Sequence, residues 1–372
     1  MPVTPIDLLL PELFAADGGI QRYSRTLIQA LQVVRPHTPL RVFIRNDHPQ
    51  HLPRKAWPGI SWHPARGSSA RMARSLARAA RSQRPQLLLS THPNFAPLQV
   101  LYQRLTGSPS WCSAHGIEVW ALRRGPKRWA LARLQRLLPV SRFTSERLQL
   151  QLGSRCPPIG VLSNSFDQSR FSPGARSPQL LQRYGLHPEQ PLILSLSRLS
   201  PDDAYKNLHK LIEALPALLP RWRDLRLLIA GEGEDKPRLQ SLADQLGASQ
   251  QVIFCGRIAE DELADHHRLA TVFALPSTGE GFGIVFLEAL GCGRPVLAGN
   301  RDGSLDPLGD GRFGLLVDPH LPLAPALASL LARQGEDLWF QPQALAQAVG
   351  EAFGFGAFCE RLEAQLSTLE VG

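Results

Sequence analysis

Short apolar runs separated by longer amphipathic stretches dominate the pattern of the chain. In the first half this pattern predicts strands at residues 6–10, 40–44 and 87–90 and a helix at 21–34. Residues 70–84 are rich in Ala and Arg and contain no Gly or Pro, so we expect a second helix there.

Residues 163–177 collect Asn, Ser, Pro and Gly without apolar periodicity, which predicts a linker. A second alternating series follows this linker. Its expected elements, in order, are strand 192–196, helix 207–219, strand 225–230, helix 236–246, strand 252–254, helix 261–269, strand 272–275, helix 286–290 and strand 295–298. Such alternation is typical of a parallel sheet covered by helices, and right-handed crossovers make the sheet doubly wound.

A chain of 372 residues is too long for one ordinary core, so two domains are expected. We predict a first domain at 1–168, a second domain at 169–350, and a C-terminal helix in 351–372 that packs back on the first domain. Ligands of such sheets bind beyond the carboxyl ends of the strands, which predicts a site in a cleft between the domains.

The composition, 43% hydrophobic and 20% charged, is that of a folded soluble protein. No run approaches the roughly 18–20 apolar residues needed to span a bilayer. The first residues lack the pattern of a signal peptide, so we expect none. The five cysteines form no CxxC pair, which favours free thiols in a reducing cytoplasm.

The charge is distributed unevenly, with 23 Lys and Arg against 6 Asp and Glu in residues 1–165 and 18 against 26 in the rest. The basic positions at helical spacing in 70–84 are Arg71, Arg74, Arg78 and Arg81, and a second basic patch contains Arg124, Lys127, Arg128 and Trp129. Cationic patches with interleaved apolar residues suit an anionic membrane surface. We therefore expect a cytoplasmic protein on the inner face of the membrane, without a nucleic-acid partner; a solvated Arg-rich surface is the alternative.

The strongest chemical signal is segment 280–288, Glu-Gly-Phe-Gly-Ile-Val-Phe-Leu-Glu, which follows an expected strand. Gly281 and Gly283 let the backbone approach a ligand closely. The unpaired first amides of the next helix favour an anion such as a diphosphate. Glu288, about two turns into this helix, can accept from both hydroxyls of a ribose. A glycine-rich helix start with two solvated glutamates is the alternative.

Two cations follow the first strand of the second half. Arg198 lies just past the strand and Lys206 precedes the next helix, where the pair can neutralise a leaving diphosphate. Ordinary surface cations are the alternative. The glycine turn at Gly231 is a weak signal, and the turn at Arg257 and Ile258 can present backbone atoms to a nucleotide base.

In the first half, Gly18 and Gly19 precede a helix, which favours an anion or a sugar close to the backbone. His115 follows an apolar stretch and precedes Gly116, so it can hydrogen-bond a sugar hydroxyl near the reacting centre.

Together these motifs resemble the retaining glycosyltransferases of family four, over residues 18–319. Segment 276–296 carries the most specific part of the resemblance, and residues 164–167 with Phe171 are similar to the Asn-Gly-Val-Asp motif of the family. The resemblance implies the α/β fold called GT-B, with two Rossmann-like doubly wound domains facing across a cleft. It makes residues 1–168 the acceptor-side domain and residues 169–350 the nucleotide-sugar-binding domain.

The resemblance also implies roles. Arg198 and Lys206 would hold the donor diphosphate, Glu288 the ribose and Glu280 the donor sugar. The backbone amides implied to bind the sugar and phosphates belong to Phe282, Gly283, Ile284 and Val285. His115 would face the sugar, and Gly18 and Gly19 would lie between donor and acceptor.

For the reaction, the resemblance implies hexose transfer from a nucleotide diphosphate sugar to a lipid-linked or cell-surface polysaccharide acceptor. It implies no metal or cofactor, and retention by a front-face route in which the donor phosphate is the base. A sugar-nucleotide 2-epimerase of the same fold and a non-catalytic nucleotide-sugar-binding protein are the alternatives.

Some positions depart from the family pattern. Ser197 replaces a Gly before the Arg, and Asn207 replaces a common Gly after the Lys. Arg198 and Lys206 are eight residues apart where many members have five, so we expect the inserted residues 201–204 to bulge outward. Residues 299–306 also differ, which bears on the identity of the donor.

Overall fold

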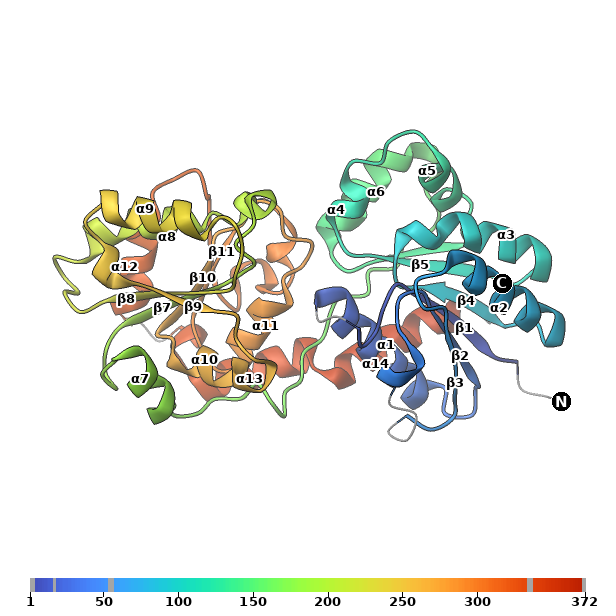
Figure 1. The fold of residues 1–372 in the computed structure, drawn as a ribbon, viewed down its shortest axis with the longest axis horizontal. Coiled ribbons are helices and arrows are strands. Elements are labelled where there is room, and N and C mark those ends of the chain that lie inside the picture. Colours follow the sequence, from blue (N-terminus) through green and yellow to red (C-terminus); the bar gives the residue numbers. More distant parts are fainter. Residues whose placement is uncertain (1–3, 16–17, 53–56, 333–336, 370–372) are drawn as a thin grey trace. The chain divides into compact units, whose positions relative to one another are not determined.

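A computed structural model describes residues 4–15, 18–52, 57–332 and 337–369 of the chain (Figure 1). The chain folds as two compact units, one formed by Met1–Ser165 with Phe355–Gly372 and the other by Phe166–Gly354. The division lies within the segment predicted as a linker, in which residues 163–177 contain neither helix nor strand.

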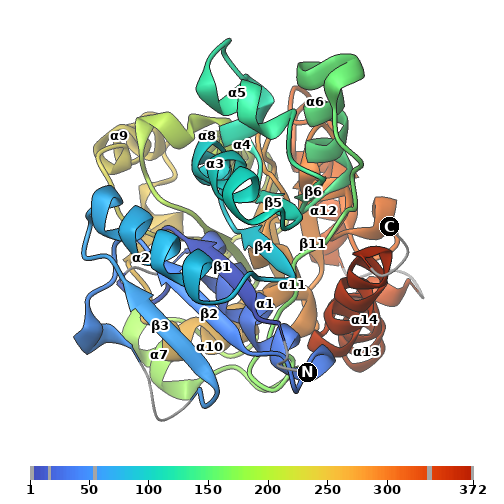
Figure 2. The ribbon, with the colours of Figure 1, turned by 90° about the vertical axis from the view of Figure 1, so that its right-hand side faces the viewer.

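The first unit contains a six-stranded sheet in the order β3-β2-β1-β4-β5-β6, and every strand pair is parallel. The strands are β1 (Ile6–Leu10), β2 (Leu40–Ile44), β3 (Ile60–Pro64), β4 (Leu87–Ser90), β5 (Ser110–Ala114) and β6 (Arg136–Pro139). The chain leaves β1 in one direction and β4 in the other, so right-handed crossovers put α1 on one face and α2 and α3 on the other. Figure 2 shows α2 and α3 in front of the strands.

The helices of the first unit are α1 (Gly19–Val34), α2 (Ser69–Ser82), α3 (Ala96–Thr106), α4 (Ile117–Trp120), α5 (Pro126–Leu131), α6 (Arg142–Leu152) and α14 (Phe355–Leu366). The last of these packs on α1, although it lies more than 300 residues away in sequence. Arg35 forms an ion pair with Glu363, and the rings of Tyr23 and Phe358 meet edge to face with centroids 6.0 Å apart. These contacts make the C-terminal helix part of the first unit.

The second unit repeats the design with the strand order β12-β11-β10-β7-β8-β9, again all parallel. Its strands are β7 (Leu192–Leu196), β8 (Arg226–Ala230), β9 (Val252–Gly256), β10 (Val272–Leu275), β11 (Val296–Gly299) and β12 (Leu315–Val317). Its helices are α7 (Pro178–Tyr184), α8 (Leu208–Leu218), α9 (Lys236–Gln245), α10 (Leu263–Leu269), α11 (Ile284–Gly291), α12 (Ala324–Ala332) and α13 (Pro342–Phe353). Every residue of β10 and β11 is buried, because helices cover both faces of the sheet.

The sheet order fixes where ligands can bind. The chain reverses direction between β1 and β4 in the first unit and between β7 and β10 in the second. Ligands of open parallel sheets bind beyond the carboxyl ends of the strands at this point. The loops after β7 and β10 are therefore the first places to look in the second unit, and those after β1, β4 and β5 in the first.

The two doubly wound parallel sheets confirm the predicted α/β class. The hydrophobic pattern nevertheless missed β3, β5, β6 and β12. Strand β3, Ile-Ser-Trp-His-Pro, is half-exposed at the edge of its sheet, and β6 and β12 are only four and three residues long. Strand β5 is fully buried but mixes two serines with three apolar residues. Short or edge strands carry too few buried positions to produce a clear periodicity.

Candidate functional site

An ion pair lies at the carboxyl ends of the central strands of the second unit. Lys206 follows the loop after β7, Glu280 follows β10, and Lys206 Nζ lies 3.6 Å from Glu280 Oε1. The two side chains are only 16% and 15% exposed. Burial raises the pKa of the Glu280 carboxyl, and the Lys206 ammonium opposes this rise. The structure thus brings together two residues that lie 74 positions apart in sequence.

A buried aspartate holds the loop that carries Glu280. Asp302, after β11, accepts from the backbone amide of Glu280 at 2.6 Å and from the hydroxyl of Ser277 at 3.0 Å. The amide of Gly303 donates to the carbonyl of Glu280 at 2.8 Å, and a Cβ on Gly303 would lie 2.2 Å from the carbonyl oxygen of Gly281. The divergent segment 299–306 therefore has a defined task, which is to clamp the glycine-rich turn.

The glycine-rich turn ends at the start of α11. Gly283 is the N-cap with φ of 84°, a left-handed conformation that glycine adopts most easily, and no side chain caps the helix. The first amides, those of Ile284 and Val285, therefore present the positive end of the helix dipole. The side chain of Phe282 is buried and packs edge to face on Phe353, so this residue can offer a ligand only its backbone.

The inserted residues between Arg198 and Lys206 form a 3₁₀ helix, Pro201–Lys206, and correct one expectation. Pro201, Asp202 and Ala204 are exposed as expected, but Asp203 points inward and its side chain is only 4% exposed. Asp203 Oδ2 lies 3.1 Å from Nε of Arg198, and Oδ1 accepts from the Tyr205 hydroxyl at 3.1 Å. Burying the charge of the Asp203 carboxylate costs free energy unless it has partners, and Arg198 and Tyr205 are these partners.

Two further positions explain how this loop is held. Asn207 adopts the left-handed conformation (φ 57°, ψ 32°) that Asn tolerates better than most residues, and its side-chain amide donates to the carbonyl of Pro276 at 2.8 Å. Gly231, after β8, has φ of 132°, and a Cβ there would lie 1.8 Å from the carbonyl oxygen of Ser197. The glycine lets the turns after β7 and β8 pack together; its predicted donor contact stays a prediction.

Glu288 lies deeper than the first glutamate of its motif. Its side chain is 3% exposed on α11, and its Oε2 lies 3.6 Å from Nε2 of His267 on α10, which is fully buried. His267 lies in no motif that would single it out from the amino-acid sequence. Arg257 is exposed and Ile258 half-buried just beyond the end of β9, at the edge of the sheet. The ribose contact of Glu288 and the base contacts of the β9 turn stay predictions.

In the first unit, His115 lies just beyond β5 and is half-buried against neighbouring loops. Its Nε2 is 2.8 Å from the carbonyl oxygen of Thr91, so Nε2 donates and Nδ1 is left as an acceptor. The ring of Tyr23 packs edge to face on His115 with centroids 4.8 Å apart, and the backbone amide of His115 donates to Glu118. Burial lowers the pKa of His115, which favours the neutral ring.

The loop after β4 contributes a residue that sequence reasoning missed. His92 caps a short 3₁₀ helix by accepting from the amide of Asn94 at 3.1 Å, and burial lowers its pKa. The predicted Gly18 is the extended N-cap of α1, without a side-chain cap, and Gly19 opens the helix. The carboxyl ends of β1, β4 and β5 thus contain Gly18, His92 and His115, as the sheet order requires.

The basic residues of the first unit are displayed on its helices. Arg71, Arg74 and Arg78 are exposed on α2, whose opposite face buries Met72 and Leu76. The second basic patch contains Arg124 in the loop before α5 and three residues of α5 itself, Lys127, Arg128 and Trp129. Lys127 Nζ donates to Asn94 Oδ1 and to the carbonyl of Glu118, both at 3.2 Å.

Among the described residues, no cluster of three or more His, Cys, Asp or Glu side chains could hold a metal ion. No helix in the same part of the chain has the length and apolarity needed to cross a membrane.

Two family models match the chain. The model described as glycosyltransferase family 4 matches residues 17–170, and the model described as glycosyl transferases group 1 matches residues 177–340. The first match falls on the unit that contains His115, and the second on the unit that contains the Lys206–Glu280 pair.

Curated relatives match over part of their length. A GDP-mannose-dependent alpha-(1-6)-phosphatidylinositol monomannoside mannosyltransferase of Mycolicibacterium smegmatis is 37% identical over 55% of this chain and 56% of the relative. A D-inositol 3-phosphate glycosyltransferase of Rhodococcus jostii is 32% identical over 58% of this chain and 49% of the relative. The chain therefore spans only about half of the length of these relatives.

Among solved structures, a sucrose-phosphate synthase from Thermosynechococcus elongatus superposes with a TM-score of 0.79 at 18% identity. The superposition covers 99% of both chains, so the similarity in fold extends over both units. This similarity and the paired parallel sheets show the GT-B fold. The two family models, which together match residues 17–170 and 177–340, show that the chain belongs to glycosyltransferase family four.

Proposed function

We propose that this protein transfers a hexose, with retention of configuration and without a metal or cofactor, from a nucleotide diphosphate sugar to a lipid-linked or cell-surface polysaccharide acceptor. The observation that carries the proposal is the Lys206–Glu280 pair, which lies at the carboxyl ends of β7 and β10 and next to the uncapped start of α11. A fixed cation and a helix start next to each other suit a departing diphosphate.

In this proposal the second unit binds the donor. Lys206 and Arg198, with the amides of Ile284 and Val285, take up the negative charge that develops on the diphosphate as the glycosidic bond breaks. Glu280 accepts hydrogen bonds from hydroxyls of the donor sugar, and Glu288 holds the ribose. The largely buried position of the Lys206–Glu280 pair favours this role, because charges interact more strongly away from bulk water.

The first unit is proposed to contribute His115 to the same reaction. Its neutral ring offers Nδ1 to a hydroxyl of the sugar, because Nε2 is occupied by the carbonyl of Thr91. Transfer then requires that the donor sugar reach His115 and the acceptor in the cleft predicted from the sequence. The oxocarbenium-like charge on the sugar is stabilised by the departing phosphate, which also takes the proton of the acceptor.

The donor can be identified with a panel of UDP-, GDP- and ADP-sugars, measured by thermal shift and by release of the nucleoside diphosphate. GDP-mannose is the first donor to test, because the Mycolicibacterium relative is a GDP-mannose-dependent mannosyltransferase. We expect one nucleotide sugar to raise the melting temperature and to be consumed only when an acceptor is added. A new sugar nucleotide formed without acceptor would instead identify an isomerase, and binding without turnover a binding protein.

We further propose that the exposed arginines of α2 bring the enzyme to an anionic membrane surface on the cytoplasmic side. Each basic residue near such a surface contributes about 1 kcal/mol of binding, so replacing Arg71, Arg74 and Arg78 by Gln should weaken binding to anionic vesicles on the order of 100-fold. Co-sedimentation measures this change. Unchanged binding of the triple variant would exclude α2 as the membrane contact.

A further inference from the structure

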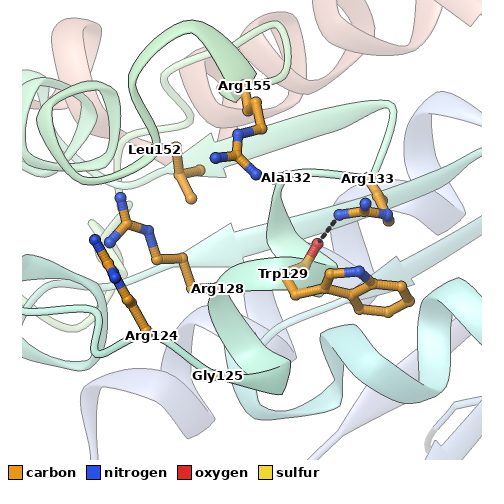
Figure 3. A pocket seen from close by; sticks show the side chains of 8 residues that line it. All are labelled: Arg124, Gly125, Arg128, Trp129, Ala132, Arg133, Leu152 and Arg155. Atoms are coloured by element: carbon orange, nitrogen blue, oxygen red, sulfur yellow. Dashed lines mark hydrogen bonds between the residues drawn. The ribbon is translucent and has the colours of Figure 1, made fainter.

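A second cationic feature of the first unit is concave. A cavity of about 300 Å³ opens between α5 and the end of α6, and Figure 3 shows the side chains that line it. The lining residues are Arg124, Gly125, Arg128, Trp129, Ala132, Arg133, Leu152 and Arg155. Four of these eight residues are arginines and none is acidic.

Three of the arginines lack partners. In the part of the chain that the structure describes, the guanidinium groups of Arg124, Arg128 and Arg155 make no hydrogen bond or ion pair, and Figure 3 shows these side chains around Leu152. Arg133 is held differently. Its Nη1 donates to the carbonyl of Trp129 at 2.9 Å, and its guanidinium lies 4.4 Å from the centre of the Trp129 ring.

Guanidinium groups that share a cavity without a carboxylate repel one another until an anion enters. The planar fork of arginine matches the oxygens of a phosphate, which it can bind through two parallel hydrogen bonds. The cavity has room for about ten water molecules at ~30 Å³ each, which is enough for a phosphate ester and too little for a folded segment of protein.

The surroundings of the cavity indicate where this phosphate comes from. Trp129 is 42% exposed, and the exposed leucines nearby are Leu101 and Leu105 on α3, which packs on α5, and Leu150 on α6, which supplies Leu152 to the cavity. Exposed leucines and a tryptophan around a cationic pocket fit the boundary between lipid headgroups and acyl chains, where aromatic rings concentrate.

We infer that this pocket is a binding site for the phosphate of one anionic phospholipid, bound between Arg124, Arg128 and Arg155. The inference goes beyond the proposed transfer reaction, because none of the proposed donor-site residues lines the pocket. It also differs from a general attraction of basic residues to membranes, because it requires three particular arginines and a defined stoichiometry.

The test compares two variants of equal charge in the full chain. One variant combines Arg124→Gln, Arg128→Gln and Arg155→Gln. The control combines Arg123→Gln, Arg147→Gln and Arg223→Gln, three exposed arginines that do not line the pocket. Binding to phosphatidylcholine vesicles containing phosphatidylglycerol is measured by co-sedimentation, without donor, and competition is measured with soluble glycerol 3-phosphate.

We expect the pocket variant to bind vesicles at least 10-fold more weakly than the control variant. Glycerol 3-phosphate should compete with vesicles for the wild-type protein and for the control variant, but not for the pocket variant. Equal losses in the two variants would overturn the inference, because they would mean that only net charge matters. If the pocket variant loses glycerol 3-phosphate binding but keeps vesicle binding, the phosphate comes from a soluble ester and the lipid assignment is wrong. Because these measurements contain no donor, failure of the proposed transfer reaction would not change their outcomes.

Discussion

Replacement of Lys206 by Met tests whether the ion pair acts on the donor or only neutralises Glu280. The atoms lie 3.6 Å apart, which at an effective dielectric constant of 20 corresponds to a gross attraction of about 4–5 kcal/mol. The free energy of unfolding lost on removing Lys206 is smaller than this gross attraction. The pKa of Glu280 is already raised, so its carboxyl can take up a proton when the ammonium is removed. We expect the free energy of unfolding to fall by about 2 kcal/mol, since both groups are largely buried.

Turnover should respond more strongly than stability. A fixed charge on a departing group is worth about 2.7–4 kcal/mol, so Lys206→Met should lower kcat by roughly 100-fold or more. Release of nucleoside diphosphate from the donor found in the panel measures kcat, and urea unfolding measures stability. Lys210→Met is the matched control, because it removes a half-buried lysine from the adjacent helix α8.

The double variant Lys206→Met with Glu280→Gln separates the two explanations. Removing both charges should restore most of the stability lost in Lys206→Met, because no unpaired carboxylate is left behind. It should not restore turnover. Recovery of turnover in the double variant, or kcat of Lys206→Met within a few-fold of the wild type, would refute the proposed role of Lys206.

Three further predictions follow from single contacts. Asp203→Asn should raise the donor KM several-fold by releasing Arg198, whereas the exposed neighbour Asp202→Asn should not; equal effects in initial-rate measurements would contradict this. Because burial lowers the pKa of His115 from 6.5, kcat should stay constant as pH falls through 6.5 and decline only at lower pH; an inflection at or above 6.5 would show that the ring is not kept neutral. Gly231→Ala should lower the free energy of unfolding by about 3 kcal/mol, because its Cβ would meet the carbonyl of Ser197. Gly185 has φ of 62° and open space around it, so Gly185→Ala should lower the free energy of unfolding by only about 1 kcal/mol. Similar urea midpoints for the two variants would argue against this packing.

Parts of the site could not be found from the sequence because they depend on contacts between distant loops. Asp302 lies in segment 299–306, which the sequence distinguishes only by its departure from the family pattern. In the structure it accepts a hydrogen bond from the amide of Glu280. Asp203 was expected to face outward with the rest of its insertion, yet it pairs with Arg198. Both are single acidic residues in loops, and a lone carboxylate has no periodicity or motif that distinguishes it from a solvated one.

The amino-acid sequence by itself determined the family and the fold class, because these depend on local features. Alternating apolar runs specify a parallel sheet with helices on both faces, and the glycines of segment 280–288 mark the turn at which β10 passes into α11. The tertiary structure alone decided which side chains meet. The orders β12-β11-β10-β7-β8-β9 and β3-β2-β1-β4-β5-β6 bring loops from distant parts of the chain to one edge of each sheet. Lys206 meets Glu280 in these loops, and Glu288 meets His267 where α11 lies beside α10. A buried charge depends on its nearest partner, and the order of residues along the chain does not specify that partner.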